Sequence, residues 1–233
     1  MTEEEVLKLL AENRNDRGLC HWETMGEDTG GLASFGIGLT QLRKLAKQAG
    51  RDHALAGRLW RSDNHDVRVL GILIDDPRQV TREQAEEQVE EVRAGMLAHV
   101  FSSCDAPLAK TSFAYDLARD WIASGHPLRR RCGYGLIYEL SKNRRRKELT
   151  DDGFLEVIER IRAEFDEAEV PVRMAMGTAL MGIGKRNESL NRTAVELARE
   201  LGPIDFSENG KKCEPFDVVK HLTSESLQAK WKS

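Results

Sequence analysis

Three segments of this 233-residue chain share one pattern, which constrains the possible fold more than any other feature. They are NHDVRVLGILI (64–74), GHPLRRRCGYGLIYEL (125–140) and EVPVRMAMGTALMGI (169–183). Each begins with a turn residue, continues with an apolar residue and an arginine, and then runs into an apolar stretch. Each also follows a segment with helical spacing of its apolar residues. The pattern therefore predicts repeated helix pairs, each of which needs a neighbour to cover its apolar face.

Most of the remaining chain also has the periodicity of helices, with apolar residues at i, i+3, i+4 and i+7. Thr2 with Glu5, and Thr81 with Gln84, have the spacing of capping boxes. Residues 20–38 and 204–217 are expected to be irregular, because Gly and polar residues interrupt the pattern. Helices are expected over 2–12, 40–49, 53–60, 67–74, 81–96, 113–123, 128–140, 154–165, 172–181 and 189–201, with a last short one in 218–231.

Helix pairs that open their second helix with a turn, an apolar residue and Arg are typical of HEAT repeats, with roughly 40–47 residues per unit. We predict an all-α fold, a right-handed α-solenoid of about five or six HEAT-like helix pairs with a concave groove. The solenoid is expected to span residues 1–189. Residues 190–233 are expected to form a C-terminal helix and an irregular extension that packs on the solenoid.

Composition excludes several classes of protein. Aromatic residues make up 6% of the chain and only 6 residues are proline, which disfavours a β-sandwich or barrel. No apolar run is long enough to span a membrane, and the acidic N-terminus lacks the features of a secretory signal. The four cysteines are scattered, without a CxxC pair. We therefore expect a reduced, cytoplasmic protein, monomeric and with no metal or other cofactor.

Basic residues are concentrated in one window although the formal net charge is -4. Residues 129–147 hold eight Lys or Arg and a single acid, Glu139, whereas residues 151–169 hold eight acids. Such a pair of clusters, three residues opening a helix and five just past its end, could bind a phosphate backbone. The alternative is a solvated loop that neutralises the acidic helix after it. The basic residues of the window are Arg129, Arg130, Arg131, Lys142, Arg144, Arg145, Arg146 and Lys147.

The chain resembles the DNA alkylation repair family, the AlkD-like HEAT-repeat DNA glycosylases. The resemblance covers roughly residues 35–187, about two thirds of the chain. Its pieces are FGIGLTQLRKLAK (35–47), HALAGRLWRSDNHDVRVLGILIDDP (53–77), SSCDAPLAKTSFAYDLARDWI (102–122), RRCGYGL (130–136) and ALMGIGKRN (179–187). It implies a concave groove that binds duplex DNA and hydrolysis of the N-glycosidic bond of alkylated purines such as 3-methyladenine and 7-methylguanine.

The resemblance also implies catalytic residues. The family's carboxylate lies in a Trp-x-x-Cys-Asp stretch, which corresponds here to Phe101 through Asp105, so Asp105 is retained and Phe101 replaces the tryptophan. An ionised carboxylate can stabilise positive charge on the deoxyribose and position a water. Arg131 matches an arginine that would hold a phosphate beside the lesion, and Thr178 replaces a second tryptophan. Core packing is the alternative for Phe101, and a cap or an ion pair with Arg131 is the alternative for Asp105.

Three functions remain open from the sequence. The first is a glycosylase that uses Asp105, Arg131 and Phe101. The second is a non-catalytic DNA-binding protein of the same family that recognises DNA shape or branched DNA, which the replacements at 101 and 178 favour. The third is a protein-interaction solenoid, which the acidic segments 83–91 and 151–169 favour. The expected DNA-binding residues are Arg129, Arg130, Lys110, Arg144, Arg145, Arg146, Lys147, Lys185 and Arg186.

Overall fold

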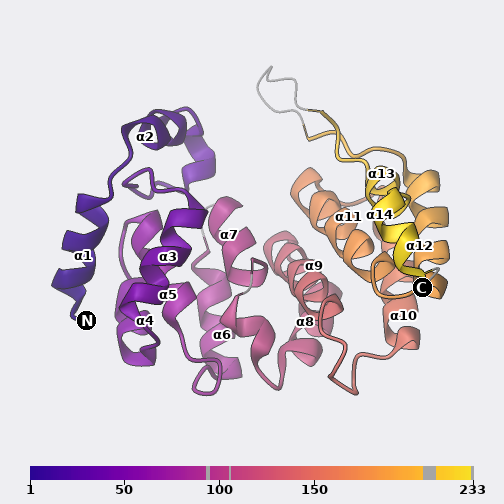
Figure 1. The fold of residues 1–233 in the computed structure, drawn as a ribbon, viewed down its shortest axis with the longest axis horizontal. Coiled ribbons are helices and arrows are strands. Elements are labelled where there is room, and N and C mark those ends of the chain that lie inside the picture. The colour runs from indigo at the N-terminus through magenta and orange to yellow at the C-terminus, as the bar shows by residue number, and fades with distance from the viewer. Residues whose placement is uncertain (93–94, 105, 207–213, 232–233) are drawn as a thin grey trace. The chain divides into compact units, whose positions relative to one another are not determined.

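A computed structural model describes residues 1–92, 95–104, 106–206 and 214–231. Over these residues the chain is helical and has no strand; its extended pairings are isolated bridges between Ala33 and Asn64 and between Ile204 and Phe216. This confirms the all-α prediction. Within the described part no helix is long and apolar enough to cross a membrane. The chain forms two compact units, 1–114 and 115–233, which Figure 1 shows in indigo to magenta and in pink to yellow.

The first unit contains seven α-helices among its described residues. Here α4 packs on α5, and α5 also contacts α3 and α7 (Figure 1). Part of the segment that was expected to be a loop is helical, because Asn15 caps α2 through its side chain. The helices are α1 (Glu3–Glu12), α2 (Asp16–Glu23), α3 (Leu39–Ala49), α4 (His53–Trp60), α5 (His65–Ile74), α6 (Arg82–Glu90) and α7 (Gly95–Ser102), with short 3-10 helices η1 (Gly26–Thr29) and η2 (Pro107–Lys110).

The second unit is centred on α11, which packs against α9, α12 and α13. The boundary predicted at residue 189 falls at the start of α12, inside this unit, and α12 and α13 cover α11. The helices are α8 (Ala114–Ala123), α9 (Pro127–Ser141), α10 (Asp151–Glu164), α11 (Val170–Gly184), α12 (Glu188–Leu201), α13 (Val218–Leu222) and α14 (Glu225–Gln228), followed by η3 (Ala229–Trp231).

The two predicted capping boxes differ in outcome. At α1 both halves form: Thr2 Oγ1 accepts from the Glu5 amide at 3.2 Å, and Glu5 Oε2 accepts from the Thr2 amide at 2.7 Å. At α6 the Thr81 hydroxyl accepts from the Gln84 amide at 3.1 Å, but the Gln84 side chain donates to Asp75 Oδ2 at 3.0 Å. The second half of that box is therefore replaced by a contact with the end of α5.

Glycines in the repeated segments let the two helices of a pair approach closely. A Cβ on Gly133 of α9 would lie 2.8 Å from the Ala118 carbonyl oxygen of α8, and one on Gly71 of α5 would lie 3.1 Å from the Ala56 carbonyl oxygen of α4. Both distances are shorter than ordinary van der Waals contact. The glycine is thus a packing requirement of the repeat, because a side chain there would push the pair apart.

The arginine of the repeated pattern holds the turn that precedes it. In α5 Arg68 donates from Nε to the Ser62 carbonyl at 2.6 Å and stacks over Trp60 at 5.4 Å. In α11 Arg173 donates from Nε to the Ala168 carbonyl at 2.7 Å and stacks over Phe165 at 5.7 Å. In each pair the guanidinium therefore satisfies loop carbonyls and covers the last aromatic residue of the preceding helix.

Candidate nucleic-acid interface

A hollow of about 400 Å³ in the first unit is lined by four cationic side chains. Arg43 and Lys47 lie one turn apart on α3, so they share one face of that helix. Arg51 follows α3 after Gly50, and Lys110 ends η2. None of the described lining residues is acidic; the others are Ala46, Gly50, Leu73, Ile74 and Cys104. An apolar floor beneath several cations suits a phosphate group, because it strengthens charge interactions above it.

Two of these cations have polar contacts that position them. Arg43 Nη2 donates to the Cys104 carbonyl oxygen at 3.0 Å, which ties α3 to the end of α7. Arg51 Nη1 lies 3.9 Å from Asp76 Oδ1. Asp76 itself is buried, and hydrogen bonds from Arg78 hold its pKa well below the ordinary aspartate range. Asp76 therefore stays ionised at neutral pH, and Arg78 already neutralises it.

The predicted catalytic carboxylate, Asp105, lies outside the described residues. Its neighbour Cys104 lines the cationic hollow and has a positive φ of 60°, in the left-handed region that few residues other than glycine adopt. The Cys104 Sγ lies 2.9 Å from His99 Nε2. The backbone is therefore fixed at the hollow one residue before Asp105, by contacts to α3 and to α7.

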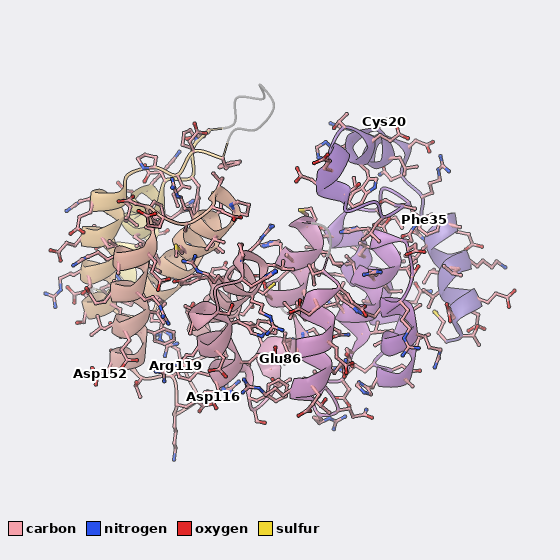
Figure 2. The ribbon with its side chains drawn as sticks, turned by 180° about the vertical axis from the view of Figure 1, so that it is seen from behind. Cys20, Phe35, Glu86, Asp116, Arg119 and Asp152 are labelled. Atoms are coloured by element: carbon pink, nitrogen blue, oxygen red, sulfur yellow. The ribbon has the colours of Figure 1, made fainter. Side chains whose placement is uncertain are left out.

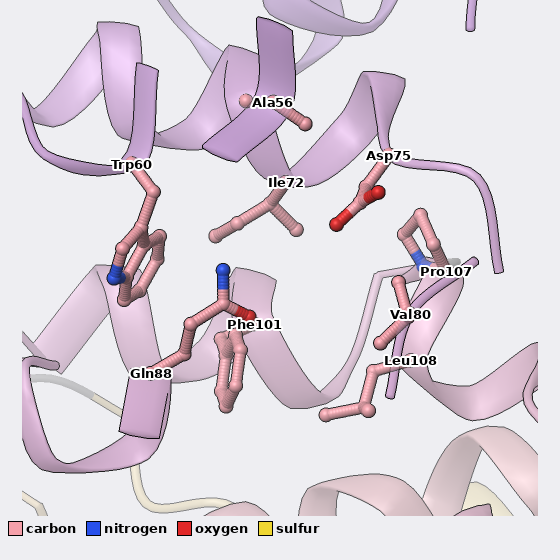
Figure 3. Close-up of a pocket in the computed structure, with 10 residues that line it drawn as sticks. Ala56, Trp60, Ile72, Asp75, Val80, Gln88, Phe101, Pro107 and Leu108 are labelled. Carbon is pink, nitrogen blue, oxygen red and sulfur yellow. The ribbon is translucent and has the colours of Figure 1, made fainter. Parts of the chain in front are cut away.

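Phe101 is a core side chain in this structure, only 3% exposed. Its ring centroid lies 5.6 Å from that of Trp60, and both line a cavity of about 20 Å³ with Ile72 and Leu108 (Figure 3). A ring buried in this way does not offer its face to a nucleobase. The alternative of core packing therefore agrees with the structure better than the predicted catalytic role does.

The three arginines at the start of α9 differ in their surroundings. Arg130 donates to Glu164 of α10 at 2.9 Å, and Glu164 also accepts from Arg160 at 2.8 Å. Arg129 and Arg131 are half-buried, and Arg129 occupies the pattern position of Arg68 and Arg173. The first turn of α9 has no acid and no side-chain cap. Three arginines therefore lie beside the positive end of the α9 dipole, and the charge of one of them, Arg130, is compensated by Glu164 of α10.

A second basic cluster forms where α9 and α11 end. Arg144 donates to the Lys185 carbonyl at 3.4 Å, so two predicted DNA-binding residues from distant parts of the sequence are neighbours. Burial lowers the pKa of Lys185, and the positive charges of Lys230 and Lys142 lower it further. We call Lys142, Arg144, Lys185 and Lys230 the basic corner. A bound anion would offset the mutual repulsion of these cations, the smaller of the two causes of the lowered pKa of Lys185.

Arg186, in contrast, is committed to the fold. Its Nη1 donates to the carbonyls of Ser141 at 2.7 Å and Asn143 at 2.9 Å, and its guanidinium stacks over Phe154 at 4.5 Å. These bonds satisfy carbonyls at the C-terminus of α9 that have no partner within the helix. The guanidinium of Arg186 therefore holds the α9–α10 loop, and its contact with DNA stays a prediction.

The remaining predicted cations are divided by exposure and pairing. Arg146 forms an ion pair with Glu148 at 2.6 Å, and its side chain is only 15% exposed. Arg145 and Lys147 are exposed on the same loop.

Thr178 lies half-buried on α11, where its hydroxyl donates to the Met174 carbonyl at 2.8 Å, so no aromatic wall stands at that position. No group of metal-ligating side chains gathers within the described ranges.

A hollow of about 420 Å³ in the second unit provides a contrast. It is lined from α8 and α10 by side chains of both signs, among them Asp116 and Arg119 of α8, which Figure 2 labels. Arg119 forms an ion pair with Glu156 of α10 at 3.3 Å. Three acids, Asp116, Asp120 and Glu156, offset Arg119 and Arg160 there. Such a mixed lining does not favour an anionic ligand.

Three of the four cations of the first hollow were not predicted from the sequence. Arg43, Lys47 and Arg51 lie in a segment without a high density of charge, and only Lys110 was singled out. The available signal was their spacing: Arg43 and Lys47 are i and i+4 on a helix whose opposite face is apolar, and Arg51 follows its terminating glycine.

Known proteins of similar sequence identify the family. The family model for the DNA alkylation repair enzyme matches residues 6–212. The chain belongs to the DNA alkylation repair enzyme family. Among curated relatives of this family member, the uncharacterized protein Lin0241 of Listeria innocua is 23% identical over 193 residues. The uncharacterized protein Lmo0209 of Listeria monocytogenes is 22% identical over the same length, and each alignment covers 82% of this chain and 83% of the relative.

A solved structure has the same fold as this alkylation-repair family member. It is described as belonging to "a new family of proteins related to the HEAT-like repeat DNA glycosylases with affinity for branched DNA structures". The TM-score is 0.82 at 22% identity, and the match covers 99% of this chain and 94% of the other. This confirms the HEAT-like architecture; the right-handed curvature and the concave groove stay predictions.

Proposed function

We propose that this protein binds DNA through its phosphate backbone and recognises DNA shape rather than sequence. The observation that carries the proposal is the hollow lined by Arg43, Lys47, Arg51 and Lys110, with no acid among its described lining residues. Phosphate contacts position a protein on DNA but carry no sequence information. A protein of net charge -4 must bind DNA through such local surfaces, because its overall field repels the backbone.

The basic corner and the start of α9 support the same function. Lys185, whose pKa is lowered mainly by burial, lies beside two other lysines, and the start of α9 holds three arginines, of which Arg130 is paired with Glu164. Each arrangement is stabilised when an anion binds. Branched DNA is a suitable shape, because a junction presents phosphates from several strands at once, and the structural relative described above has affinity for it.

A binding measurement tests the proposal. The affinities for a four-way junction, a forked duplex, a linear duplex and a single strand of equal length are compared as a function of salt. We expect tighter binding to the branched forms and a log–log slope that indicates several phosphate contacts. Equal affinity for all four forms would contradict shape recognition. If none of the four forms showed salt-dependent binding, the remaining function would be protein interaction, with the acidic helices α6 and α10 as the contact surfaces.

Excision of alkylated purines is the second candidate function. It is favoured by the anchoring of Cys104, whose carbonyl accepts from Arg43 at the cationic hollow, one residue before Asp105. An ionised Asp105 near a bound strand would stabilise the positive charge that develops on deoxyribose as the base leaves. By the family resemblance, Arg131 of the second unit would hold a phosphate of the bound DNA. An alkylated purine is already cationic, so one carboxylate and a positioned water suffice for the hydrolysis.

The excision test uses duplex DNA that contains 7-methylguanine. Release of the free base by the natural protein, lost in Asp105→Asn with DNA affinity unchanged, is the expected result for a glycosylase. Asp105→Glu is the matched control, because it keeps the charge and is expected to retain part of the activity. A natural protein that binds the methylated duplex and releases no base over a long incubation would exclude excision and leave the binding function standing.

A further inference from the structure

A second cavity of the first unit, separate from the cationic hollow, is apolar and has a volume of about 220 Å³. Its walls come from α2, α3, α5 and α7 and from the loop before α3. No Lys or Arg is among its described lining residues, and the carboxylate that lines it is Asp66. We call it the α2–α3 pocket. Its lining is Gly18, His21, Trp22, Met25, Ser34, Gly36, Ile37, Gly38, Leu39, Leu42, His65, Asp66, Val69, Met96 and Val100.

Two aromatic side chains define one wall of this pocket. The ring centroids of Trp22 and His65 lie 4.6 Å apart with an angle of 42° between the rings. The indole Nε1 of Trp22 donates to the Leu32 carbonyl at 3.0 Å, so its orientation is fixed. Met25 and Met96 add flexible, polarisable thioethers that adapt to the shape of a flat ring.

His65 points to the kind of ligand. The residue is 7% exposed, and its Nε2 has no hydrogen-bond partner although it is buried. Its Nδ1 lies 3.5 Å from Asp66 Oδ1, and Asp66 in turn accepts from the Ser34 hydroxyl at 2.8 Å and from the Phe35 amide. The carboxylate favours the proton on Nδ1, which leaves Nε2 as an acceptor. A buried acceptor without a partner costs free energy that a ligand N–H would recover.

We propose that the α2–α3 pocket binds a single unpaired nucleobase. A nucleobase is flat and uncharged. One of its faces can contact Trp22, and its edge N–H groups can donate to His65 Nε2 once the side chains that cover this atom in the structure move aside. The pocket is smaller than common sites for drug-sized ligands, roughly 300 Å³ and above, which suits a molecule of one or two rings. Phosphate is excluded, because the described lining has no cation and includes a carboxylate.

The position of the pocket agrees with a base from a bound strand. Leu39 and Leu42 of α3 line the pocket, and Arg43 and Lys47 of the same helix line the cationic hollow. From Leu39 to Lys47 the helix rises about 12 Å, at 1.5 Å per residue. Successive phosphates of one strand are about 3.4 Å apart along a duplex axis, so the two sites are separated by a few nucleotides. This source of the base rests on the proposed DNA binding, whereas a free base in solution does not.

The experiment uses 2-aminopurine, a fluorescent purine, in two arms. The first arm adds the free base to the protein, and the second adds a forked DNA that carries 2-aminopurine in its single-stranded arm. Contact with Trp22 is expected to quench the fluorescence. Quenching of the free base alone assigns the pocket to a free nucleobase, and quenching in the DNA assigns it to a base extruded from a strand. Quenching in neither arm overturns the proposal.

Variants show whether the quenching comes from this pocket. Gly38→Leu places an apolar side chain at the rim, where a Cβ meets no atom within 4 Å, and is expected to weaken binding of 2-aminopurine roughly tenfold or more. Gly57→Leu is the matched control, because Gly57 is equally open but lies on α4 outside the pocket. His65→Phe keeps a ring but removes the acceptor, and is expected to weaken binding of 2-aminopurine without changing the salt dependence of binding to a linear duplex.

The failure of this proposal can be distinguished from failure of the proposed function. If the protein binds forked DNA in a salt-dependent manner but 2-aminopurine is never quenched, the pocket proposal is wrong and DNA binding stands. If no DNA binds but free 2-aminopurine is quenched and Gly38→Leu abolishes the quenching, the pocket stands and DNA binding is wrong. Equal quenching in the natural protein and in Gly38→Leu, with Gly57→Leu also unchanged, would show that the base binds elsewhere and overturn the proposal.

Discussion

The cationic hollow of the first unit and the basic window 129–147 of the second unit differ in how their cations are brought together. The window holds more cations, but Arg130, Lys142 and Arg146 are paired with acids. The described lining of the hollow contains no acid, and of its cations Arg51 lies 3.9 Å from Asp76; the four cations come from a span of 68 residues, from Arg43 to Lys110. Charge density along the chain is therefore a poor measure of the charge that a surface offers to a phosphate.

The reason lies in helix geometry. Cations that are adjacent in sequence point in different directions around a helix, and several of them meet acids on neighbouring helices or the carbonyls of helix ends. Cations from α3, from the turn after it and from η2 are distant in sequence but converge on one apolar floor. A phosphate site needs such convergence, which a count within a window does not detect.

The largest expected effect comes from removing charge in the two regions. The triple variant Lys47→Gln, Arg51→Gln and Lys110→Gln is expected to weaken duplex affinity on the order of ten- to a hundredfold near physiological salt. The slope of log affinity against log salt is expected to fall by roughly 0.9 for each phosphate that the variant no longer neutralises. The measurement is a salt titration of DNA binding. Arg43 is kept, because its bond to Cys104 also holds α7.

The matched control removes three cations from the basic window: Arg144→Gln, Arg145→Gln and Lys147→Gln. We expect a smaller loss of affinity and a smaller change in slope, because the loop also contains cations that acids neutralise. A larger effect in the window than in the hollow would reverse the comparison and show that the sequence density identified the principal surface.

Much of the fold could be predicted from the sequence, because amphipathic periodicity and caps are local signals. The repeated segments indicated the helix pairs correctly, and Arg68 and Arg173 show the same packing in two of the three pairs. The segment 20–38 was predicted less well: Gly and polar residues suggested a loop, but the side chain of Asn15 caps a helix that begins at Asp16. The α2–α3 pocket is formed by that helix together with α3, α5 and α7, so no pattern within one segment of the sequence could have indicated the pocket.

The second prediction separates two neighbouring cations that the sequence placed in one group. Arg186→Gln is expected to destabilise the second unit by about 1–3 kcal/mol, because the carbonyls of Ser141, Asn143 and Leu149 lose their donor. DNA affinity of the folded protein is expected to change little. Chemical denaturation measures the first effect and a binding titration the second.

Lys185→Gln serves as the opposite case. Its ammonium is crowded by Lys142 and Lys230, so removing the charge is expected to leave stability unchanged or slightly higher while DNA affinity falls. If Arg186→Gln reduced DNA affinity more than Lys185→Gln did, with no loss of stability, the structural role assigned to Arg186 would be wrong.

The candidate site could be predicted only in part. The resemblance to the family identified Asp105 and Arg131 by motif, but a motif specifies a residue type and not its exposure. Phe101 shows the difference, because an aromatic residue in that motif can either face a ligand or fill the core. Burial depends on contacts with α4 and α5, more than 25 residues away in the sequence.

The smallest expected effect comes from enlarging Phe101. Phe101→Trp adds volume beside a cavity of only about 20 Å³, so we expect a loss of about 1 kcal/mol in the free energy of unfolding from overpacking. Phe35→Trp is the control, because Phe35 is half-buried in the loop before α3 and has more room to adjust. Denaturant titration compares the two variants, and a DNA-binding titration accompanies it. A ring that served as a platform for a base would instead gain contact area as tryptophan. If the variant were as stable as the natural protein, and if it also bound DNA more tightly or released 7-methylguanine faster, Phe101 would be assigned to the binding site and not to the core.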